Sequence, residues 1–323
     1  MIPAAFDYLA PTTVDEVVAA LAEHGDEAKV LAGGQSLIPM LALRLAVFEH
    51  LIDVGRIPEL RGIERRNGSL WVGAGTTEAA VERSPEAAAA APLLARATPF
   101  IGHFQIRSRG TVGCSIAHAD PAAEYPAVAL ALDATMEVLA PAGPRTIPAA
   151  EYFTGLWSTA TEPDELLTGV SFPVWEGRCG FAVEEFARRH GDFALAGATV
   201  ALELDTDDRV RRLSTALTQR LESLATAVGA IAGADETRDR HDDLEYRAKR
   251  ILPLRGAVEQ WCIFVVEQVF KLFVEQIGVV IGLAGHRQNG TGLVVEHPEA
   301  GDALLAQDLG DLRVPQEGDL LVG

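Results

Sequence analysis

The chain has 323 residues, of which 48% are hydrophobic and 23% are charged, and its formal net charge is −19. Single hydrophobic cores stop growing near ~250–300 residues, so a globular chain of this length is expected to divide into two or three lobes. The negative charge repels the phosphates of nucleic acids and of anionic lipids. The composition therefore excludes nucleic acid and membrane surfaces as expected partners.

Cysteine usage limits the cofactors that the chain could hold by itself. Its three cysteines, Cys114, Cys179 and Cys262, lie far apart and form no CxxC pair. This spacing argues against a disulfide scaffold and against a thiolate metal site. The first residues, MIPAAFDYLAPTTVDEVV, show neither a basic segment nor a long apolar segment. Secretory signals carry both, so we expect a cytoplasmic protein. From the cysteine spacing, we expect no metal site on this chain.

The first third of the chain predicts alternating helices and strands. Thr13 is a candidate N-cap and Gly25 a stop for a helix between them. Short apolar runs at 28–34, 50–57 and 70–77, each bounded by Gly, Asp or Pro, are typical of strands. An alanine-rich stretch follows and predicts helical segments interrupted at two prolines, Pro85 and Pro92.

The remainder predicts strands and then helices. Residues 135–141 and 166–174 read as strands around the turn PAGP and the short helical segment AAEYF. Residues 180–205 are mostly strand-like, and charged helical patterns are expected from 210 to 255. The apolar run 261–283 carries Glu267, Lys271 and Glu275 at intervals of four, which marks one polar helical face. That polar face argues against a membrane span and favours a partner-binding or self-association helix.

Two glycine-containing stretches carry the functional signal. In KVLAGGQSL, residues 29–37, two glycines follow directly on a short apolar strand. In GTVGCSIAHADPAAE, residues 110–124, small residues precede His118, Asp120 and Glu124. Glycines at a strand end indicate either a tight turn or the close approach of another group. Successive amides in such turns form anion-binding nests, to which serine and threonine hydroxyls add donors. Neither stretch matches GxGxxG or GxxxxGK[ST], so a Rossmann fold and a P-loop are both excluded on spacing.

These residues resemble a known family. The segments KVLAGGQSLIPMLALRLA, IGHFQIRSRGTVGCSIAHADPAAEYPAVALALDA, PDELLTGVSFP and FARRHGDFALAGA are similar to the FAD-binding medium subunit of the molybdenum hydroxylases. That family includes aerobic carbon monoxide dehydrogenase, the nicotine and caffeine dehydrogenases, and the flavin domain of xanthine dehydrogenase. The resemblance covers about residues 1–205. It implies an α+β fold, namely a two-lobed FAD-binding domain of the vanillyl-alcohol-oxidase (PCMH) type followed by a C-terminal α+β domain.

The resemblance also implies where FAD binds. The first stretch would wrap the pyrophosphate, the second would complete the cradle, and two apolar positions would flank the flavin ring. The cofactor-binding positions implied are Lys29, Val30, Leu31, Ala32, Gly33, Gly34, Gln35, Ser36, Leu37, Ile101, Gly110, Thr111, Gly113, Cys114, Ser115, Ala117, His118, Asp120, Ala123, Glu124 and Leu167.

Several residues of this set have a simpler structural interpretation. His118 could be a loop histidine satisfied by the backbone, Asp120 could form an Asx turn before Pro121, and Cys114 could be an inert small residue. Two positions depart from the family. Cys114 stands where a second glycine is usual, and the region of Glu184 and Glu185 lacks a lysine that the family often has.

The predicted organisation and function follow from this resemblance. We expect FAD-binding lobes at 1–55 and 56–175, a C-terminal α+β domain at 176–260 and an atypical tail at 261–323. With three scattered cysteines, the chain lacks the four thiolates of an ordinary iron–sulfur cluster. The family then implies a small iron–sulfur subunit and a large molybdopterin subunit as partners, in a dimer of heterotrimers (a heterohexamer). The predicted role is electron transfer from those clusters through FAD to an external acceptor, with no catalytic residue on this chain.

Two alternatives stay open at this point. One is a self-contained flavin oxidoreductase of the same fold, which would need its own substrate base. The other is a flavin-free assembly subunit that has lost the cofactor.

Overall fold

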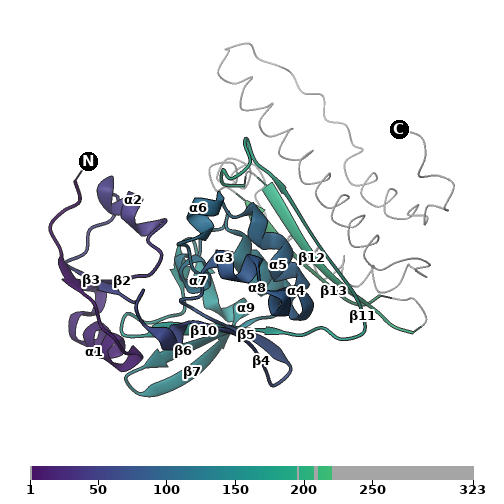
Figure 1. The fold of residues 1–323 in the computed structure, drawn as a ribbon, viewed down its shortest axis with the longest axis horizontal. Coiled ribbons are helices and arrows are strands. Elements are labelled where there is room, and N and C mark those ends of the chain that lie inside the picture. The colour runs from purple at the N-terminus through teal and green to yellow at the C-terminus, as the bar shows by residue number, and fades with distance from the viewer. Residues whose placement is uncertain (1, 195, 207–209, 220–323) are drawn as a thin grey trace, which may run out of the picture.

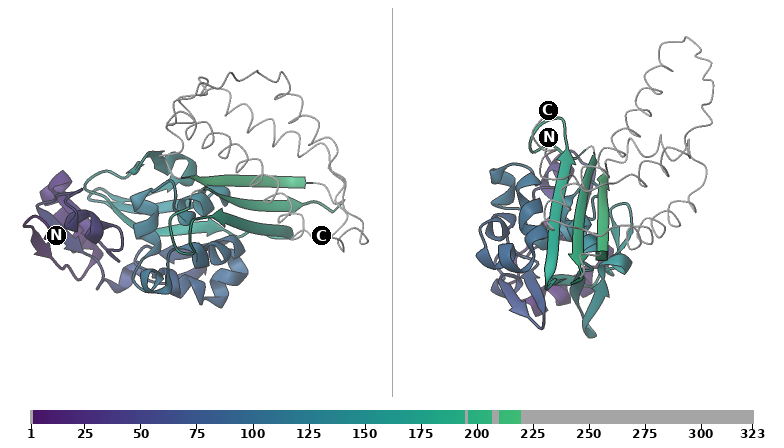
Figure 2. Two further views of the ribbon diagram at one scale, coloured as in Figure 1. Left: turned by 90° about the horizontal axis from the view of Figure 1, so that it is seen from above. Right: turned by 90° about the vertical axis from the view of Figure 1, so that its right-hand side faces the viewer.

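A computed structural model describes residues 2–194, 196–206 and 210–219, and all structural statements concern these residues. Three sheets of three or more strands follow one another along the described chain, and a separate two-stranded pair lies within the second of these regions. Figure 1 shows the amino-terminal lobe at one side and the third of the larger sheets, called the third sheet below, at the other. The helices expected at 220–255 and the apolar segment at 261–283 lie outside the described residues. The view from above in Figure 2 shows the long strands of the third sheet beyond the central helices.

The amino-terminal lobe is a small parallel sheet with a helix against it. Its strand order is β1–β3–β2, with both pairs parallel. Thr13 caps α1 as predicted: its hydroxyl accepts from the Glu16 amide at 3.2 Å, and the Glu16 carboxylate accepts from the Thr13 amide at 3.2 Å. Gly25, with φ of 53°, ends the helix. The elements are β1 (Asp7–Leu9), α1 (Val14–His24), a 3₁₀ turn (Gly25–Glu27), β2 (Ala28–Leu31), α2 (Leu37–Ala42) and β3 (His50–Asp53).

The second lobe is a five-stranded antiparallel sheet covered by short helices (Figure 1). The strand order is β4–β5–β10–β6–β7, so β10 returns from far along the chain to the centre of the sheet. The strands are β4 (Ile63–Arg66), β5 (Ser69–Gly73), β6 (Thr135–Ala140), β7 (Gly143–Pro148) and β10 (Leu166–Pro173), with a separate pair β8 (Phe153–Gly155) and β9 (Ser158–Thr159). The helices are α3 (Glu78–Glu82), α4 (Pro85–Ala90), α5 (Pro92–Ala97), α6 (Phe104–Arg107), α7 (Val112–His118), α8 (Glu124–Ala131) and α9 (Ala149–Tyr152), with 3₁₀ turns at Pro58–Leu60 and Thr98–Phe100.

Pro85 and Pro92 each begin a helix, which explains why the alanine-rich stretch is divided. Proline lacks the amide that an interior helical position must donate, but it fits the first turn. The hairpin β4–β5 was not predicted, although Asn67 and Gly68 form its turn with φ of 48° and 79°. Asn-Gly with both residues at positive φ is the favoured two-residue hairpin turn.

The third sheet corrects one prediction. Its strands are β11 (Arg178–Phe186), β12 (Ala196–Leu204) and β13 (Val210–Gln219), all antiparallel. The helix expected to begin at Val210 is therefore wrong for residues 210–219. The spacing of Val210, Leu213 and Ala216 suits a helix, but pairing with β12 decides the structure, because tertiary context overrides local propensity. The Thr199 hydroxyl donates to the Ala216 carbonyl at 3.2 Å across this pair.

Two hydrophobic clusters join the three sheets. The larger lies between the five-stranded sheet and its helices, and it includes Phe181 and Ala201 of the third sheet. The smaller fills the amino-terminal lobe and includes Leu166 of β10. Each cluster therefore crosses from one sheet to the next. The boundaries predicted for the four sequence units remain predictions.

Candidate functional site: two glycine loops

The first glycine loop connects β2 to α2. Gly34 has φ of 71°, a left-handed conformation that glycine adopts without steric cost. Its carbonyl accepts from the Ile38 amide at 3.1 Å, and the Gln35 side chain donates to the Gly33 carbonyl at 3.0 Å. Of the predicted segment, Lys29, Val30 and Leu31 lie in β2, Ala32 to Ser36 form the loop, and Leu37 begins α2.

The second glycine loop leads into α7. The Thr111 hydroxyl caps this helix by accepting from the Cys114 amide at 3.2 Å. Gly113 packs against the end of β5, where a side chain would meet the Cα of Ala74 at 2.7 Å. Alanine at Gly113 therefore has no room, and the glycine is required by helix–strand packing.

The two loops touch each other. A Cβ atom on Gly33 would clash with the carbonyl oxygen of Arg109 and would lie 2.8 Å from the Cα of Gly110. Gly33 is therefore a glycine because the second loop's backbone lies directly against it. Segments that are 75 or more residues apart in sequence meet here at the boundary between the amino-terminal lobe and the second lobe.

The two loops differ in whether their backbone amides have hydrogen-bond acceptors. Among the described residues, no acceptor takes a hydrogen bond from the amides of Gly33, Gly34, Gln35 or Ser36. Gly33 and Gly34 are buried, and a buried amide without a partner is costly. This set of donors fits the oxygen atoms of a pyrophosphate.

Amides of the second loop instead donate within the protein. The Val112 amide donates to the Thr76 carbonyl at 3.0 Å, the Gly113 amide to the Ala74 carbonyl at 2.9 Å, and the Ser115 amide to the Thr111 carbonyl at 3.1 Å. The second loop is thus left with side-chain groups to offer, such as the Ser115 hydroxyl and the His118 ring.

Lys29 links the loops electrostatically. Burial lowers the pKa of His118, Asp120 opposes that shift, and the charge of Lys29 lowers the pKa further. Burial also raises the pKa of the Cys114 thiol to about 11, with Glu78 adding to the rise and Lys29 opposing it. A thiol with a raised pKa stays protonated at neutral pH and is a weak nucleophile, whereas the inert interpretation of Cys114 remains a prediction. Lys29 supplies a positive charge beside both loops.

The remaining polar positions follow the second loop. Asp120 forms the Asx turn predicted for it, since its Oδ1 accepts from the Ala122 amide at 2.8 Å. Its carbonyl accepts from the Ala123 amide at 3.0 Å. Ala117 is exposed in the last turn of α7, and Glu124 begins α8.

Ile101 and Leu167 belong to one hydrophobic cluster. Leu167 is buried in β10 beside a register shift, and the half-buried Ile101 packs against the same cluster. Arg107 holds the Ile101 segment in place by donating to the carbonyls of Ile101 and Gly102 at 3.1 and 3.0 Å. The guanidinium also pairs with the Glu82 carboxylate at 2.9 and 3.1 Å. Arg107 was missed as a site residue because its partners lie in other elements.

Glu78 is a second residue that sequence reasoning missed. Its carboxyl lies against the second loop, where a Cβ on Gly110 would come within 2.6 Å of Glu78 Oε2. Burial raises the pKa of Glu78 to about 8, and the charge of Arg107 acts against that rise. Oε2 has no hydrogen-bond partner among the described residues. The sequence gives no signal for this, because Glu78 looks like an ordinary acidic residue in a first helical turn.

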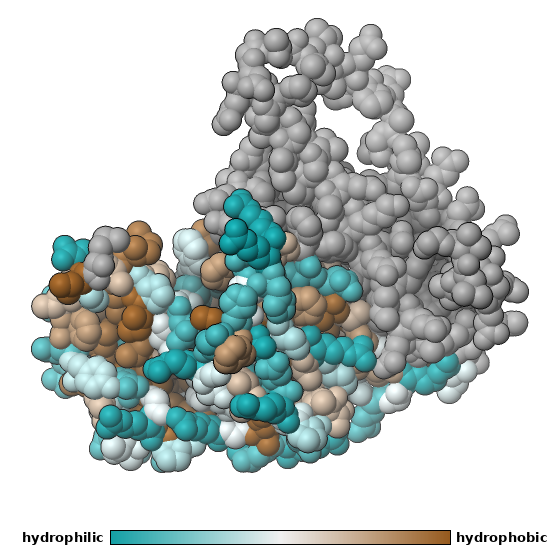
Figure 3. All heavy atoms as spheres, turned by 45° about the horizontal axis from the view of Figure 1, so that its top comes forward, coloured by the Kyte–Doolittle hydropathy of each residue, from teal (hydrophilic) through white to brown (hydrophobic). Residues whose placement is uncertain are grey.

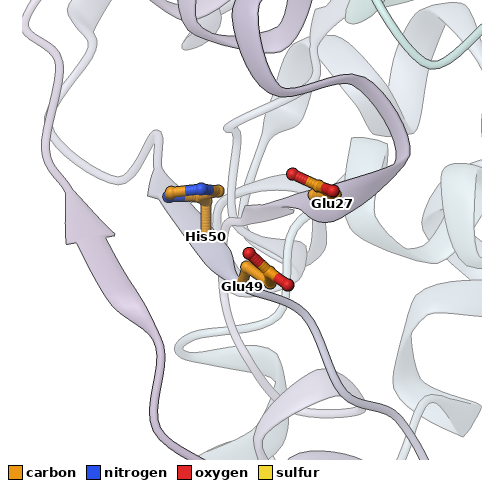
Figure 4. Close-up of side chains that lie close together, drawn as sticks. All are labelled: Glu27, Glu49 and His50. Atoms are coloured by element: carbon orange, nitrogen blue, oxygen red, sulfur yellow. The ribbon is translucent and has the colours of Figure 1, made fainter.

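Another group of polar side chains lies outside these loops. Glu27, Glu49 and His50 each place a potential ligand atom within 4.8 Å of the other two, as Figure 4 shows. Both carboxylates are exposed, and exposed acidic groups commonly lie together without an ion. The group lies at the start of β2 and β3, whereas the first glycine loop follows the end of β2. It is therefore separate from the loops.

Comparison with known proteins places most of the described chain in one family. Residues 4–175 match the family described as the FAD binding domain in molybdopterin dehydrogenase. The carbon monoxide dehydrogenase medium chain of Hydrogenophaga pseudoflava is 44% identical over 202 residues, which are 62% of this chain and 70% of the relative. The 6-hydroxypseudooxynicotine dehydrogenase complex subunit alpha of Paenarthrobacter nicotinovorans is 36% identical over 272 residues, covering 78% and 92% of the two chains.

Solved structures give the same result for the fold. A carbon monoxide dehydrogenase from Hydrogenophaga pseudoflava, in a form that lacks the Mo-pyranopterin moiety, superposes with a TM-score of 0.66 and 43% identity. The match covers 68% of this chain and 76% of the other. The mixed α+β fold predicted from the sequence is confirmed. Within the part of the chain that the structure describes, no helix has the length and apolar character to cross a bilayer.

Proposed function

The chain belongs to the family of FAD-binding domains of molybdopterin dehydrogenases, and from this premise we propose that it transfers electrons through FAD within a multi-subunit molybdenum hydroxylase. Membership makes it an FAD-binding oxidoreductase subunit. The observation that carries the rest of the proposal is the contact between the two glycine loops, with four adjacent amides that lack acceptors. These donors match the charge and size of a pyrophosphate.

The chain's own residues bind and orient the cofactor in this proposal. The amides from Gly33 to Ser36 hold the pyrophosphate, and Lys29 contributes positive charge. Ser115 and His118 contribute side-chain donors from the second loop. Ile101 and Leu167 form the apolar boundary for the flavin ring. When bound, FAD supplies the capacity to accept electrons and release them to an external acceptor.

Electrons must reach this site from another chain. Three cysteines do not supply the four thiolates of an ordinary iron–sulfur cluster. We therefore assign the clusters and the molybdopterin to a small and a large partner subunit, assembled as a dimer of heterotrimers. The relatives named as medium chain and complex subunit support a role within an assembly. A cytoplasmic location remains a prediction.

The surface of the amino-terminal lobe also supports assembly. Ile38, Leu43, Leu45 and Val47, on and after α2, are each 45% or more exposed. Figure 3 shows that apolar side chains gather on this lobe. Clustered exposed apolar side chains are typical of protein contact surfaces. The helix expected at 261–283 lies outside the described residues and stays a prediction.

Purification of the native assembly tests this proposal. An affinity-tagged copy of the chain, produced in its own host, should co-purify with an iron–sulfur protein and a molybdenum protein. Chain masses, iron, molybdenum and flavin content measure the outcome. Equal amounts of three chains are expected, with one FAD for each copy of this chain. A flavin-loaded chain that purifies alone and turns over a substrate would favour the self-contained oxidoreductase, and an assembled chain without flavin would favour the assembly subunit.

A further inference from the structure

Glu78 is a buried carboxyl group to which the proposed function gives no task. It begins α3 directly after Thr77, whose hydroxyl caps that helix by accepting from the Ala80 amide at 3.2 Å. The residue is only 5% exposed, and its Oε2 has no hydrogen-bond partner among the described residues. A buried polar atom without a partner costs free energy, so its position calls for a physical reason.

The Glu78 carboxyl lies against the open face of Gly110. A Cβ on Gly110 would come within 2.6 and 2.7 Å of the two carboxyl oxygens. The backbones are joined at the same place, because the Glu78 amide donates to the Gly110 carbonyl at 2.9 Å, and Thr77 and Thr111 form an antiparallel bridge. The φ of Gly110 is not positive, so its conformation does not demand glycine. Glycine stands here because the carboxyl occupies the space of a Cβ atom.

Gly110 in turn contacts the first glycine loop. A Cβ on Gly33 would lie 2.8 Å from the Cα of Gly110. Contacts therefore run from the Glu78 side chain, through the backbone of Gly110, to the backbone of Gly33. The Gly33 amide is the first of the four donors that have no acceptor. A shift of Gly110 would thus change the place of the donors assigned to the pyrophosphate.

Burial also decides in which form Glu78 makes this contact. It raises the pKa of the carboxyl to about 8, while the charge of Arg107 acts against the rise. The carboxyl therefore keeps its proton at neutral pH. It contacts Gly110 as a neutral group, so glutamine matches it in both shape and charge.

We propose that Glu78 is a positioning residue for FAD: its carboxyl packs on Gly110 and so holds the second glycine loop against Gly33. The inference rests on the proposed binding of FAD at the glycine loops. Glu78 acts through Gly110 and makes no contact with the cofactor in this proposal.

The packing around α3 makes this contact restrictive. An exposed glutamate would turn away from a new methyl group at little cost, because its carboxyl ends a flexible side chain. Helix α3, in contrast, packs against α4, α5, α6 and the turn at Thr98–Phe100. The enclosed Glu78 side chain has little room to move, so a Cβ at Gly110 must displace the loop.

A double-mutant cycle tests the contact. Gly110→Ala places a methyl group against the carboxyl and should weaken FAD binding about fivefold or more. Glu78→Ala should weaken binding too, because Gly110 loses its support. In the double variant Glu78→Ala/Gly110→Ala, the new methyl group occupies space that the carboxyl has left. This double variant should therefore bind FAD more tightly than either single variant.

Three controls separate this contact from general damage to the fold. Glu78→Gln should keep FAD affinity close to the wild-type value. Gly113→Ala clashes with the backbone of Ala74, so addition of Glu78→Ala should not restore its binding. Glu86→Ala removes a half-exposed carboxylate that pairs with Arg65, and it should leave FAD affinity unchanged.

Fluorescence titration of each apoprotein with FAD measures the dissociation constants, and thermal melting of the same samples follows their stability. A role of Glu78 in folding alone would lower the melting temperature of Glu78→Ala but would give no rescue of FAD binding in the double variant. The inference is overturned by a Gly110→Ala variant with wild-type affinity, by a double variant no better than the single ones, or by Glu78→Gln as weak as Glu78→Ala. A wild-type chain that takes up no FAD would overturn the proposed function as well, whereas normal uptake without rescue overturns this inference alone.

Discussion

Replacing Gly33 with alanine should release FAD from the chain while the secondary structure stays intact. The added methyl group would lie 2.1 Å from the Arg109 carbonyl oxygen and 2.8 Å from the Cα of Gly110, both far too close. Both are backbone atoms, so the clash can be removed only if the two loops move apart. Overpacking of this kind costs ~1–3 kcal/mol. If the loops can move apart in the apoprotein but not with FAD bound, that strain weakens FAD binding by about 5- to 150-fold. Fluorescence titration of the apoprotein with FAD measures the change.

Gly155→Ala is the matched control for this substitution. A Cβ at Gly155 would meet only the Cβ of Ser158 at 3.8 Å, an ordinary contact in the β8–β9 hairpin. FAD affinity should therefore stay at the wild-type value in this control. Full flavin retention in Gly33→Ala, together with an unchanged circular dichroism spectrum, would show that contact between the loops is not needed for FAD binding.

Replacing Arg107 with alanine should destabilise the second lobe much more than replacing an exposed arginine there. Its side chain is only 10% exposed and forms a two-pronged pair with Glu82 while it holds the Ile101–Gly102 segment. Removing Arg107 leaves the Glu82 charge without its partner. Breaking a fully buried pair costs ~3–5 kcal/mol, and because the Glu82 side chain is 31% exposed, the loss should fall below that range. Urea unfolding should show this loss, and the Ile101 side of the FAD site should become mobile with it.

Two further variants calibrate the Arg107 result. Arg65 also pairs with a glutamate, Glu86, at 2.9 Å, but both side chains are about half exposed. Arg65→Ala should therefore hardly change the unfolding midpoint. Arg107→Lys keeps the charge and loses the planar fork, so its loss should be intermediate. An Arg107→Ala variant as stable as Arg65→Ala would contradict the structural role given to this arginine.

The sequence predicted the elements that local chemistry determines. The capped helix α1, the strand before the first glycine loop and the helices that begin at Pro85 and Pro92 all follow from nearby residues. Residues 210–219 were predicted wrongly, because their spacing suits a helix while β12 offers a partner strand. A single segment carries no information about a partner strand.

In the candidate site, too, features set by nearby residues were predicted and features set by distant contacts were not. The glycine loops and the Asx turn at Asp120 could be recognised from residue types alone. The roles of Glu78 and Arg107 could not, because they depend on contacts with Gly110 and with Glu82 and the Ile101 segment. Nor could the sequence show that the free amides belong to the first loop, since the acceptors for the second loop's Val112 and Gly113 amides come from Thr76 and Ala74, just after β5.

Anaerobic absorbance of the flavin in the purified chain tests the central claim most directly. The chain, loaded with FAD and free of other subunits, is mixed with carbon monoxide or an N-heterocyclic compound and then with an artificial electron donor. We predict that the donor bleaches the flavin band and that the substrates leave it unchanged, because the proposed function has this chain bind FAD and receive its electrons from partner subunits. Bleaching by a substrate alone would contradict the account, and so would a chain that shows no flavin band after incubation with FAD.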